Sequence, residues 1–367
     1  MSENISLPKI FLQRENIQHI LVIKLRHFGD VLLTTPLFRT LKINYPNALI
    51  DALVYEGTEA MLACNKDINN IYTIDRSLKK QGIKAQVTGE YNLFKKLSHV
   101  HYDLILNLSD HMRTAVYCRL LKPTFSIAFC HPKHNNWLWK SAHSILLPTE
   151  SYYEEHVVPY TLSILSPLAL PEVSTKVTMA YCQQDLQCFE KIKQQYTLKD
   201  YILIQPTARW AFKTWSAKSF SELINYLTQK GFKVVLTAGK AEEELALVEK
   251  IIAGCHDHAM LVNLAGNLSL TQLAAMIDHA KLFIGVDSAP MHMAAALQTP
   301  MVVLFGPTNL KQWYPWQVKH KLIWAGSYRE LPHFLQINTD TDERYLDAIP
   351  VQDVIKAVAE QLTANLK

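Results

Sequence analysis

Residues 19–36 read HILVIKLRHFGDVLLTTP, a short apolar run that passes through a glycine turn into an amphipathic stretch. Residues 19–25 are rich in β-branched side chains, which favours a buried strand, and residues 31–45 have the periodicity of a helix. The same rhythm continues along the chain, with further strands expected at 49–55, 69–75, 102–109 and 125–130. Buried strands that alternate with helices predict a parallel, doubly wound sheet.

A second series of the same kind begins at residue 201. Its strands are expected at 201–208, 232–239, 260–266, 281–287 and 300–306. Ser269 followed by Gln272 has the form of a capping box and predicts a helix start. Prolines interrupt the pattern near residues 165–174, which divides the chain into two Rossmann-like domains with a ligand cleft between them. The predicted divisions are 1–170, 171–345 and a C-terminal amphipathic helix within 346–367 that packs back on the first domain.

Composition and length limit the class of protein. A chain of 367 residues is long enough for two domains, and 49% hydrophobic with 19% charged residues is typical of a well-packed globular enzyme. The formal net charge of +4 does not call for a nucleic-acid partner. Six cysteines lie scattered without a CxxC pair, which favours a reducing cytoplasm. The chain shows neither a signal-peptide pattern nor an apolar run of about 18 residues, so any membrane contact is expected to be peripheral.

Positive charge is concentrated between Arg76 and His101. This stretch holds six lysine or arginine residues and one acid, Glu90. A run of this kind is either a solvated face or a patch for an anionic lipid surface or a phosphorylated acceptor. The sequence leaves both interpretations open.

The turn between the first strand and the first helix places an acid beside a glycine. Asp30 follows Gly29 where a helix N-cap is expected, so a purely structural role explains it. The helix N-terminus would also favour the charged carboxylate. Such a group could act as a base if proton transfer from an acceptor hydroxyl comes late in the reaction.

Two segments of the second half offer a binding site for phosphate. Residues 285–292, GVDSAPMH, follow a strand and open a helix of small residues, so a diphosphate could approach the free N–H groups there. Asp287 could hold a sugar or ribose hydroxyl or order the turn, and His292 could donate to a phosphate or be a packing residue. Residues 205–215, QPTARWAFKTW, contain Lys213, which is either a cation for a leaving diphosphate or a surface lysine beside a core tryptophan.

Taken together, and in this order over nearly the whole chain, the three segments resemble the glycosyltransferase family nine heptosyltransferases, above all their heptosyltransferase III branch. Those enzymes extend the inner core of lipopolysaccharide. The resemblance implies a GT-B fold with an N-terminal acceptor domain and a C-terminal donor domain. It also implies an inverting, metal-independent transfer from ADP-L-glycero-D-manno-heptose that needs no cofactor. The implied acceptor is an inner-core heptose.

The resemblance also assigns residues. It implies Asp30 as the general base and donor contacts at Thr207, Lys213, Glu242, Asp287, Ser288, Ala289 and His292. Charge and domain position add acceptor contacts, which we expect at Arg26, His27, Arg113 and Lys133. No metal ligand is expected, because the DxD at 340–342 lies in a polar loop.

Location and partners follow from the same reasoning. We expect a monomer at the cytoplasmic face of the inner membrane, in peripheral contact with it, whose partners are the nucleotide sugar and the lipopolysaccharide acceptor. Two alternatives stay open. One is a GT-B transferase that uses another sugar nucleotide, and the other is a non-catalytic nucleotide-binding protein in which Asp30 is only a cap.

Overall fold

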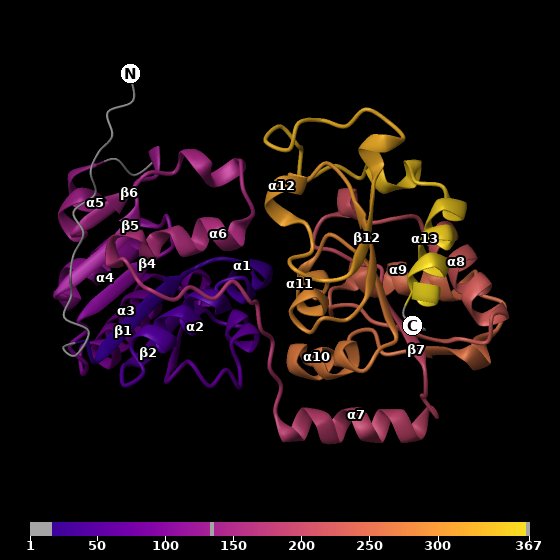
Figure 1. The fold of residues 1–367 in the computed structure, drawn as a ribbon, viewed down its shortest axis with the longest axis horizontal. Coiled ribbons are helices and arrows are strands. Elements are labelled where there is room, and N and C mark those ends of the chain that lie inside the picture. The colour runs from indigo at the N-terminus through magenta and orange to yellow at the C-terminus, as the bar shows by residue number, and fades with distance from the viewer. Residues whose placement is uncertain (1–16, 133–135, 365–367) are drawn as a thin grey trace. The chain divides into compact units, whose positions relative to one another are not determined.

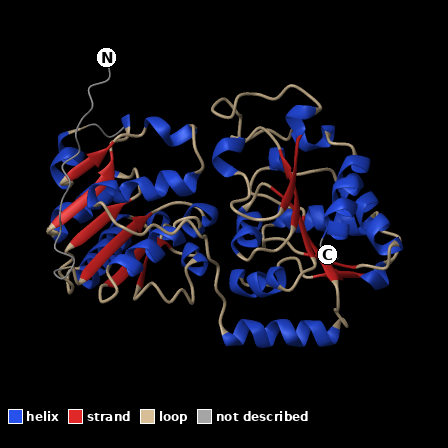
Figure 2. Cartoon of the chain, viewed as in Figure 1, coloured by secondary structure: helices blue, strands red, loops and turns tan. Residues whose placement is uncertain are grey.

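The computed structural model describes residues 17–132 and 136–364, and the chain divides into two compact units between Val177 and Thr178. The division lies a few residues beyond the boundary expected after residue 170. In the described part of each unit, helices flank one six-stranded parallel sheet (Figure 1, Figure 2). The parallel, doubly wound architecture predicted from the strand and helix pattern is therefore confirmed.

The first sheet has the strand order β3-β2-β1-β4-β5-β6. Its strands are β1 (His19–Lys24), β2 (Leu49–Tyr55), β3 (Ile71–Ile74), β4 (Leu104–Asn107), β5 (Phe125–Phe129) and β6 (Ile145–Leu147). Its helices are α1 (Phe28–Leu32), α2 (Thr35–Asn44), α3 (Ile83–Leu97), α4 (Met112–Leu121), α5 (Trp137–Ala142) and α6 (Val157–Leu162). β1 is buried from Ile20 onward, so both faces of this central strand are covered, as its continuous apolar run requires.

The first predicted helix is divided in two. Pro36 lies in the first turn of α2, where its missing N–H costs no helical hydrogen bond, whereas the middle of one long helix would lose a bond there. The hydroxyl of Thr34 donates to the Val31 carbonyl at 2.6 Å, a hydrogen bond that stabilises the turn between α1 and α2. α1 is therefore a short helix that follows β1 and contains Gly29.

The second sheet has the order β12-β11-β10-β7-β8-β9, which repeats the topology of the first. Its strands are β7 (Tyr201–Gln205), β8 (Lys233–Leu236), β9 (Leu261–Asn263), β10 (Leu282–Val286), β11 (Met301–Phe305) and β12 (His320–Trp324). Its helices are α7 (Gln183–Gln195), α8 (Ala217–Gln229), α9 (Glu242–Ala253), α10 (Leu270–Asp278), α11 (Ala289–Ala296), α12 (Leu310–Trp313) and α13 (Val351–Ala364). The capping box predicted at Ser269 and Gln272 is present at the start of α10.

The C-terminal helix belongs to the second unit. α13 packs on α8, β11 and β12, and its apolar residues Val354, Val358 and Leu362 are part of the core of that unit. The apolar face of α13 is thus buried in the core of the second unit, and the expectation that this helix packs back on the first domain stays a prediction.

Both sheets change winding direction at one place. In the first sheet the chain passes from the β3 edge back to β4, beside β1, and in the second it passes from β9 back to β10, beside β7. Ligands of doubly wound sheets bind at the carboxyl ends of the strands at such a switch point. No helix among the described residues is both long and apolar enough to cross a membrane.

Candidate active site

The switch point of the first unit is closed by contacts between the loops that follow β1 and β4. The Leu25 N–H donates to the Ser109 hydroxyl at 2.6 Å, and the guanidinium of Arg26 lies 2.8 Å from the carboxylate of Asp110. Burial opposes the charge on Asp110, but Arg26 outweighs it, helped by two histidines, and lowers the pKa of this carboxyl. Arg26 is therefore held in place at the carboxyl end of β1.

Asp30 is not the helix cap that its position suggested. The N-cap of α1 is His27, and Asp30 is the third residue of the first turn. Its side chain is half-buried, and it makes no hydrogen bond or ion pair within the described residues. Because the carboxylate does not serve the helix as a cap, its structural explanation is weaker than the sequence implied.

Lys24 is a feature of this site that the sequence reasoning missed. It is the last residue of β1, and its side chain is 8% exposed. Burial lowers the pKa of its ammonium, and the nearby charge of Asp30 opposes that shift. A lysine within an apolar strand could have been recognised as unusual, because lysine is rarely buried without a partner.

Three of the four predicted acceptor residues, Arg26, His27 and Arg113, lie in the segments that follow β1 and β4. Burial, together with the charges of Arg26 and Arg113, lowers the pKa of His111, so both guanidinium groups act on one histidine. Arg113 also pairs with Glu90 at 3.1 Å and lines a hollow of about 240 Å³. The other residues that line it include Tyr55, Arg76 and Lys79. His27 is exposed, and Lys133 lies outside the described residues.

The second unit brings Lys213 and Asp287 into direct contact. The Lys213 ammonium is 2.6 Å from the Asp287 carboxylate, and the Thr308 hydroxyl donates to the same oxygen at 2.7 Å. Asp287 is 5% exposed. Burial works against its charge, but Lys213 and Thr308 outweigh it and hold the pKa of the carboxyl below its usual range. An ion pair thus joins the loops that follow β7 and β10.

α11 begins immediately after this ion pair. Its N-cap is Ser288, but the Ser288 side chain makes no capping hydrogen bond, and its hydroxyl is buried without a partner in the described residues. Ala289 is the first helical residue, and His292 is buried one turn on. Pro290 has no N–H, and the Met291 N–H donates to the Ser288 carbonyl at 3.2 Å, so Ala289 supplies the first-turn N–H that makes no hydrogen bond within the described residues. Such a helix start can accept an anion.

Thr207 is part of a third group of contacts at the carboxyl ends of β7 and β8. Its buried hydroxyl donates to Glu244, which also accepts the Gly239 N–H at 2.9 Å. A Cβ on Gly239 would lie 2.6 Å from the Glu244 carboxylate, so a larger residue there would displace the Glu244 side chain. Glu242, the predicted ribose contact, is exposed at the first position of α9. Glu244, two residues further on, is the acid that this site contains.

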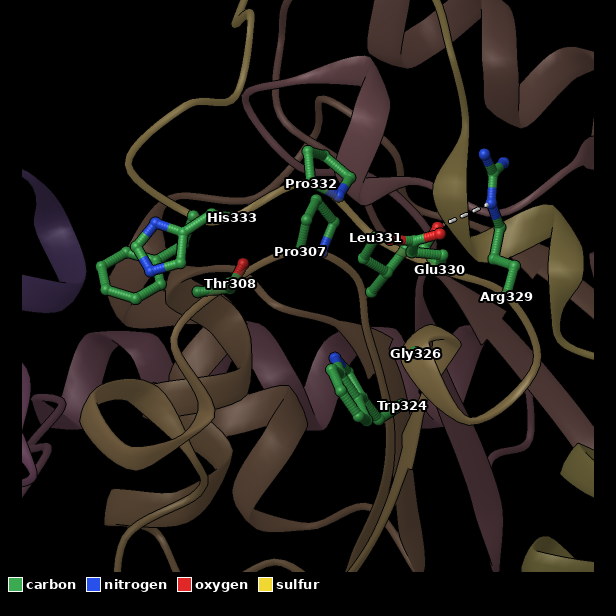
Figure 3. A pocket seen from close by; sticks show the side chains of 10 residues that line it. Pro307, Thr308, Trp324, Gly326, Arg329, Glu330, Leu331, Pro332 and His333 are labelled. Carbon is green, nitrogen blue, oxygen red and sulfur yellow. Dashed lines mark hydrogen bonds between the residues drawn. The ribbon is translucent and has the colours of Figure 1, made fainter.

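A separate hollow of about 410 Å³ opens beside Thr308 (Figure 3). Pro307, Trp324 and Pro332 contribute apolar walls, and the Trp324 indole donates to the Gly306 carbonyl at 3.1 Å.

Within the residues that the structure describes, no cluster of three or more histidine, cysteine or acidic side chains could hold a metal ion.

The sequence profile of glycosyltransferase family 9 (heptosyltransferase) matches residues 90–341, more than half of the chain. The chain belongs to glycosyltransferase family 9. A lipopolysaccharide heptosyltransferase 3 of Escherichia coli K12 is 39% identical over 342 residues, covering 92% of this chain and 96% of that protein. A lipopolysaccharide heptosyltransferase 2 of Salmonella typhimurium LT2 is 26% identical over 309 residues, covering 79% of this chain and 83% of that protein. The resemblance found in the three sequence segments is thus confirmed.

Solved family 9 structures share the fold. A glycosyltransferase family 9 protein from Veillonella parvula has a TM-score of 0.81 at 20% identity, covering 95% of this chain and 97% of that one. An Escherichia coli heptosyltransferase solved with ADP has a TM-score of 0.72 at 18% identity, covering 94% of this chain and 100% of that one. The GT-B fold expected of a family 9 glycosyltransferase is confirmed.

Proposed function

We propose that this family 9 glycosyltransferase moves a heptosyl group from ADP-L-glycero-D-manno-heptose to a heptose of the lipopolysaccharide inner core. The observation that carries the proposal is the Lys213–Asp287 pair at the start of α11, where the Ser288 hydroxyl is buried and makes no capping hydrogen bond. The Escherichia coli K12 relative is a lipopolysaccharide heptosyltransferase 3, and an Escherichia coli heptosyltransferase of the same fold is solved with ADP-2-deoxy-2-fluoro heptose. These relatives support the choice of donor and acceptor.

The second unit would bind the donor. The diphosphate would sit at the N-terminus of α11, near Ser288 and Ala289, where N–H groups and the helix dipole favour negative charge. Lys213 would then meet the charge that develops on the leaving ADP, with His292 as a second donor. Asp287 holds the lysine in place through their ion pair, so the cation is oriented before the reaction begins. In this proposal no metal ion is needed.

The first unit would supply the base. Asp30 would take the proton of the acceptor hydroxyl while that oxygen bonds the anomeric carbon and the bond from this carbon to the diphosphate breaks. The electron pair of the broken bond leaves with ADP. Attack from the face opposite the leaving group inverts the anomeric centre in one step. Arg26, His27 and Arg113 would position the anionic acceptor, which we place at the cytoplasmic face of the inner membrane.

The proposal is tested with purified protein and a delipidated core acceptor. ADP-heptose, UDP-sugars and GDP-sugars are supplied in turn, with and without EDTA, while nucleotide release and acceptor mass are followed. We expect release of ADP and the addition of one heptose, whose anomeric configuration in the product is opposite to that in the donor. EDTA should have no effect on turnover. Preference for a UDP- or GDP-sugar would support the alternative transferase. Nucleotide binding without any release would support the non-catalytic alternative.

A further inference from the structure

Three neighbouring helices of the first unit expose large apolar side chains to solvent. On α3, Ile83, Val87 and Tyr91 are 80%, 61% and 63% exposed, and their spacing of four residues places them on one helix face. α4 exposes Val116 and Leu120, and α5 exposes Trp137, at 72%. Large exposed apolar side chains that gather on neighbouring elements can mark an interaction site.

Side-chain contacts link the three helices, which all belong to the first unit (Figure 1). Arg113 of α4 pairs with Glu90 of α3 at 3.1 Å, and Arg119 of α4 donates to the Ser141 carbonyl of α5 at 3.2 Å. Arg119 also stacks on Trp137, 5.6 Å from the ring centroid. We call the exposed side of these three helices the α3–α5 face. Its members are Ile83, Lys84, Val87, Tyr91, Lys95, Lys96, Val116, Arg119, Leu120, Trp137 and Lys140.

Core packing accounts for only some of the apolar residues of α3. Leu97 is buried and Leu93 and Phe94 pack against the core, whereas Ile83, Val87 and Tyr91 are exposed. The contact of α3 with the short 3-10 helix η3 (Ser77–Gln81) is close, because a Cβ on Gly89 would lie 2.3 Å from the Leu78 side chain. η3 thereby adds two exposed lysines, Lys79 and Lys80, next to the α3–α5 face.

The charge of this face has one sign. The three helices contain a single acid, Glu90, and it is turned inward, where Arg113 pairs with it and the Tyr117 hydroxyl donates to it. Lys84, Lys95 and Lys96 are exposed. Apolar side chains that include a tryptophan and a tyrosine, surrounded by lysines, are suited to the boundary of an anionic bilayer.

We propose that the α3–α5 face docks on the surface of a membrane that contains anionic phospholipid. The apolar side chains would enter the headgroup region while the lysines meet lipid phosphates. Arg113 links this face to the edge of the sheet that carries Arg26, so a lipid-anchored acceptor would reach that edge from the same side of the first unit. The inference deepens the membrane location given under the proposed function and does not depend on which sugar is transferred.

Vesicle binding tests the inference directly. The full-length protein is mixed with vesicles of phosphatidylethanolamine containing phosphatidylglycerol, and bound protein is measured by sedimentation. The triple variant Ile83→Ser/Val87→Ser/Tyr91→Ser and the variant Lys84→Gln/Lys95→Gln/Lys96→Gln should each bind at least about tenfold more weakly. Wild-type binding should fall with added salt and on pure phosphatidylcholine.

Matched control variants distinguish binding through the α3–α5 face from non-specific adsorption of the protein to vesicles. Val173→Ser/Leu335→Ser removes two apolar side chains that are 56% and 60% exposed elsewhere, and Lys218→Gln/Lys240→Gln/Lys250→Gln removes three exposed lysines of the second unit. Both controls should bind vesicles like the wild type. All variants should keep the wild-type Tm. They should also keep the wild-type turnover on a delipidated acceptor, because that assay contains no membrane.

Three results would overturn the inference. The first is equal loss of vesicle binding in the control and face variants. The second is unchanged binding when the face is altered. The third is a protein that does not bind vesicles and instead self-associates through Ile83, Val87 and Tyr91, which sedimentation velocity without lipid would reveal. None of these outcomes would affect the proposed donor or reaction.

Discussion

The Lys213 ammonium lies 2.6 Å from the Asp287 carboxylate, and Thr308 donates to the same carboxylate oxygen. The pair joins the loops after β7 and β10 at the place where the second sheet changes direction. Because Asp287 is 5% exposed and Lys213 is held to it, the lysine is fixed before any ligand binds. A cation oriented in this way can stabilise a leaving diphosphate without rearrangement.

Replacing Lys213 with Met should lower both donor affinity and stability. The variant keeps the length of the side chain but leaves a buried carboxylate without its cation, a change that costs about 3 kcal/mol in the free energy of unfolding. Donor binding, measured by calorimetry with ADP, should weaken at least about tenfold through loss of the charge contact. Lys218→Met, on the exposed face of α8, should change neither quantity.

The same variant should make stability depend on pH in a new way. In the wild type the pKa of Asp287 is lowered, so the pair stabilises the native state above the unfolded pKa and loses this contribution only in stronger acid. Without Lys213, burial would raise that native pKa above the unfolded value. The penalty would then be present at neutral pH and shrink as the pH falls toward about 4. Urea unfolding of both proteins at several pH values measures this, and a constant difference would contradict the account.

Ser288 and Ser269 make a matched pair of helix caps. Ser269 accepts the Gln272 N–H at 3.1 Å, whereas the Ser288 side chain makes no capping bond. Ser269→Ala should therefore cost about 1 kcal/mol in the free energy of unfolding and leave donor binding unchanged. Ser288→Ala should cost less than about 0.5 kcal/mol yet weaken ADP binding several-fold, because its hydroxyl faces the proposed diphosphate. Equal stability losses in the two variants would show that Ser288 is an ordinary cap.

Glu244 and Glu242 lie on the same turn of α9 but have different surroundings. Glu244 accepts from Thr207 and from the Gly239 N–H, so Glu244→Ala should release the loops after β7 and β8 and destabilise the protein by about 1–3 kcal/mol. Glu242→Ala removes an exposed side chain and should change stability by less than about 0.5 kcal/mol. Chemical denaturation distinguishes them. If Glu242→Ala alone weakens ADP binding, the original assignment of the ribose contact is right.

Much of the fold was predictable because the central strands are apolar runs bounded by turns. β1 and β10 were expected within a residue of their observed bounds, and β7 begins at Tyr201 as expected but ends at Gln205 instead of residue 208. α11 begins at Ala289, within the stretch 285–292 where a helix start was expected. Asp30, Lys213 and Asp287 lie in the segments that follow these three strands, so the candidate site residues could be chosen from sequence. Local pattern and tertiary structure agree at these positions.

Other elements were missed for physical reasons. α3 was interpreted as a charged run, because its apolar residues face solvent and its helical period is masked by lysines. α7 buries only Asp185 and Phe189 and therefore has almost no apolar stripe. Helical periodicity identifies the apolar face of α13, but it does not indicate which core that face packs against. Glu244 could be chosen over Glu242 only from the fold, because both acids lie in the first turn of α9.

The central claim is that Asp30 is the base in heptosyl transfer, and the turnover of Asp30→Asn tests it most directly. Asparagine keeps the shape of the side chain but cannot take the proton, so kcat should fall by about 10²–10⁴-fold. ADP-heptose affinity should stay at the wild-type value, and Tm should fall only slightly, because Asp30 acts on buried Lys24 through its charge alone. Asp200→Asn, at a position 76% exposed, serves as the control. An Asp30→Asn enzyme that turns over within a few-fold of the wild type would contradict the account.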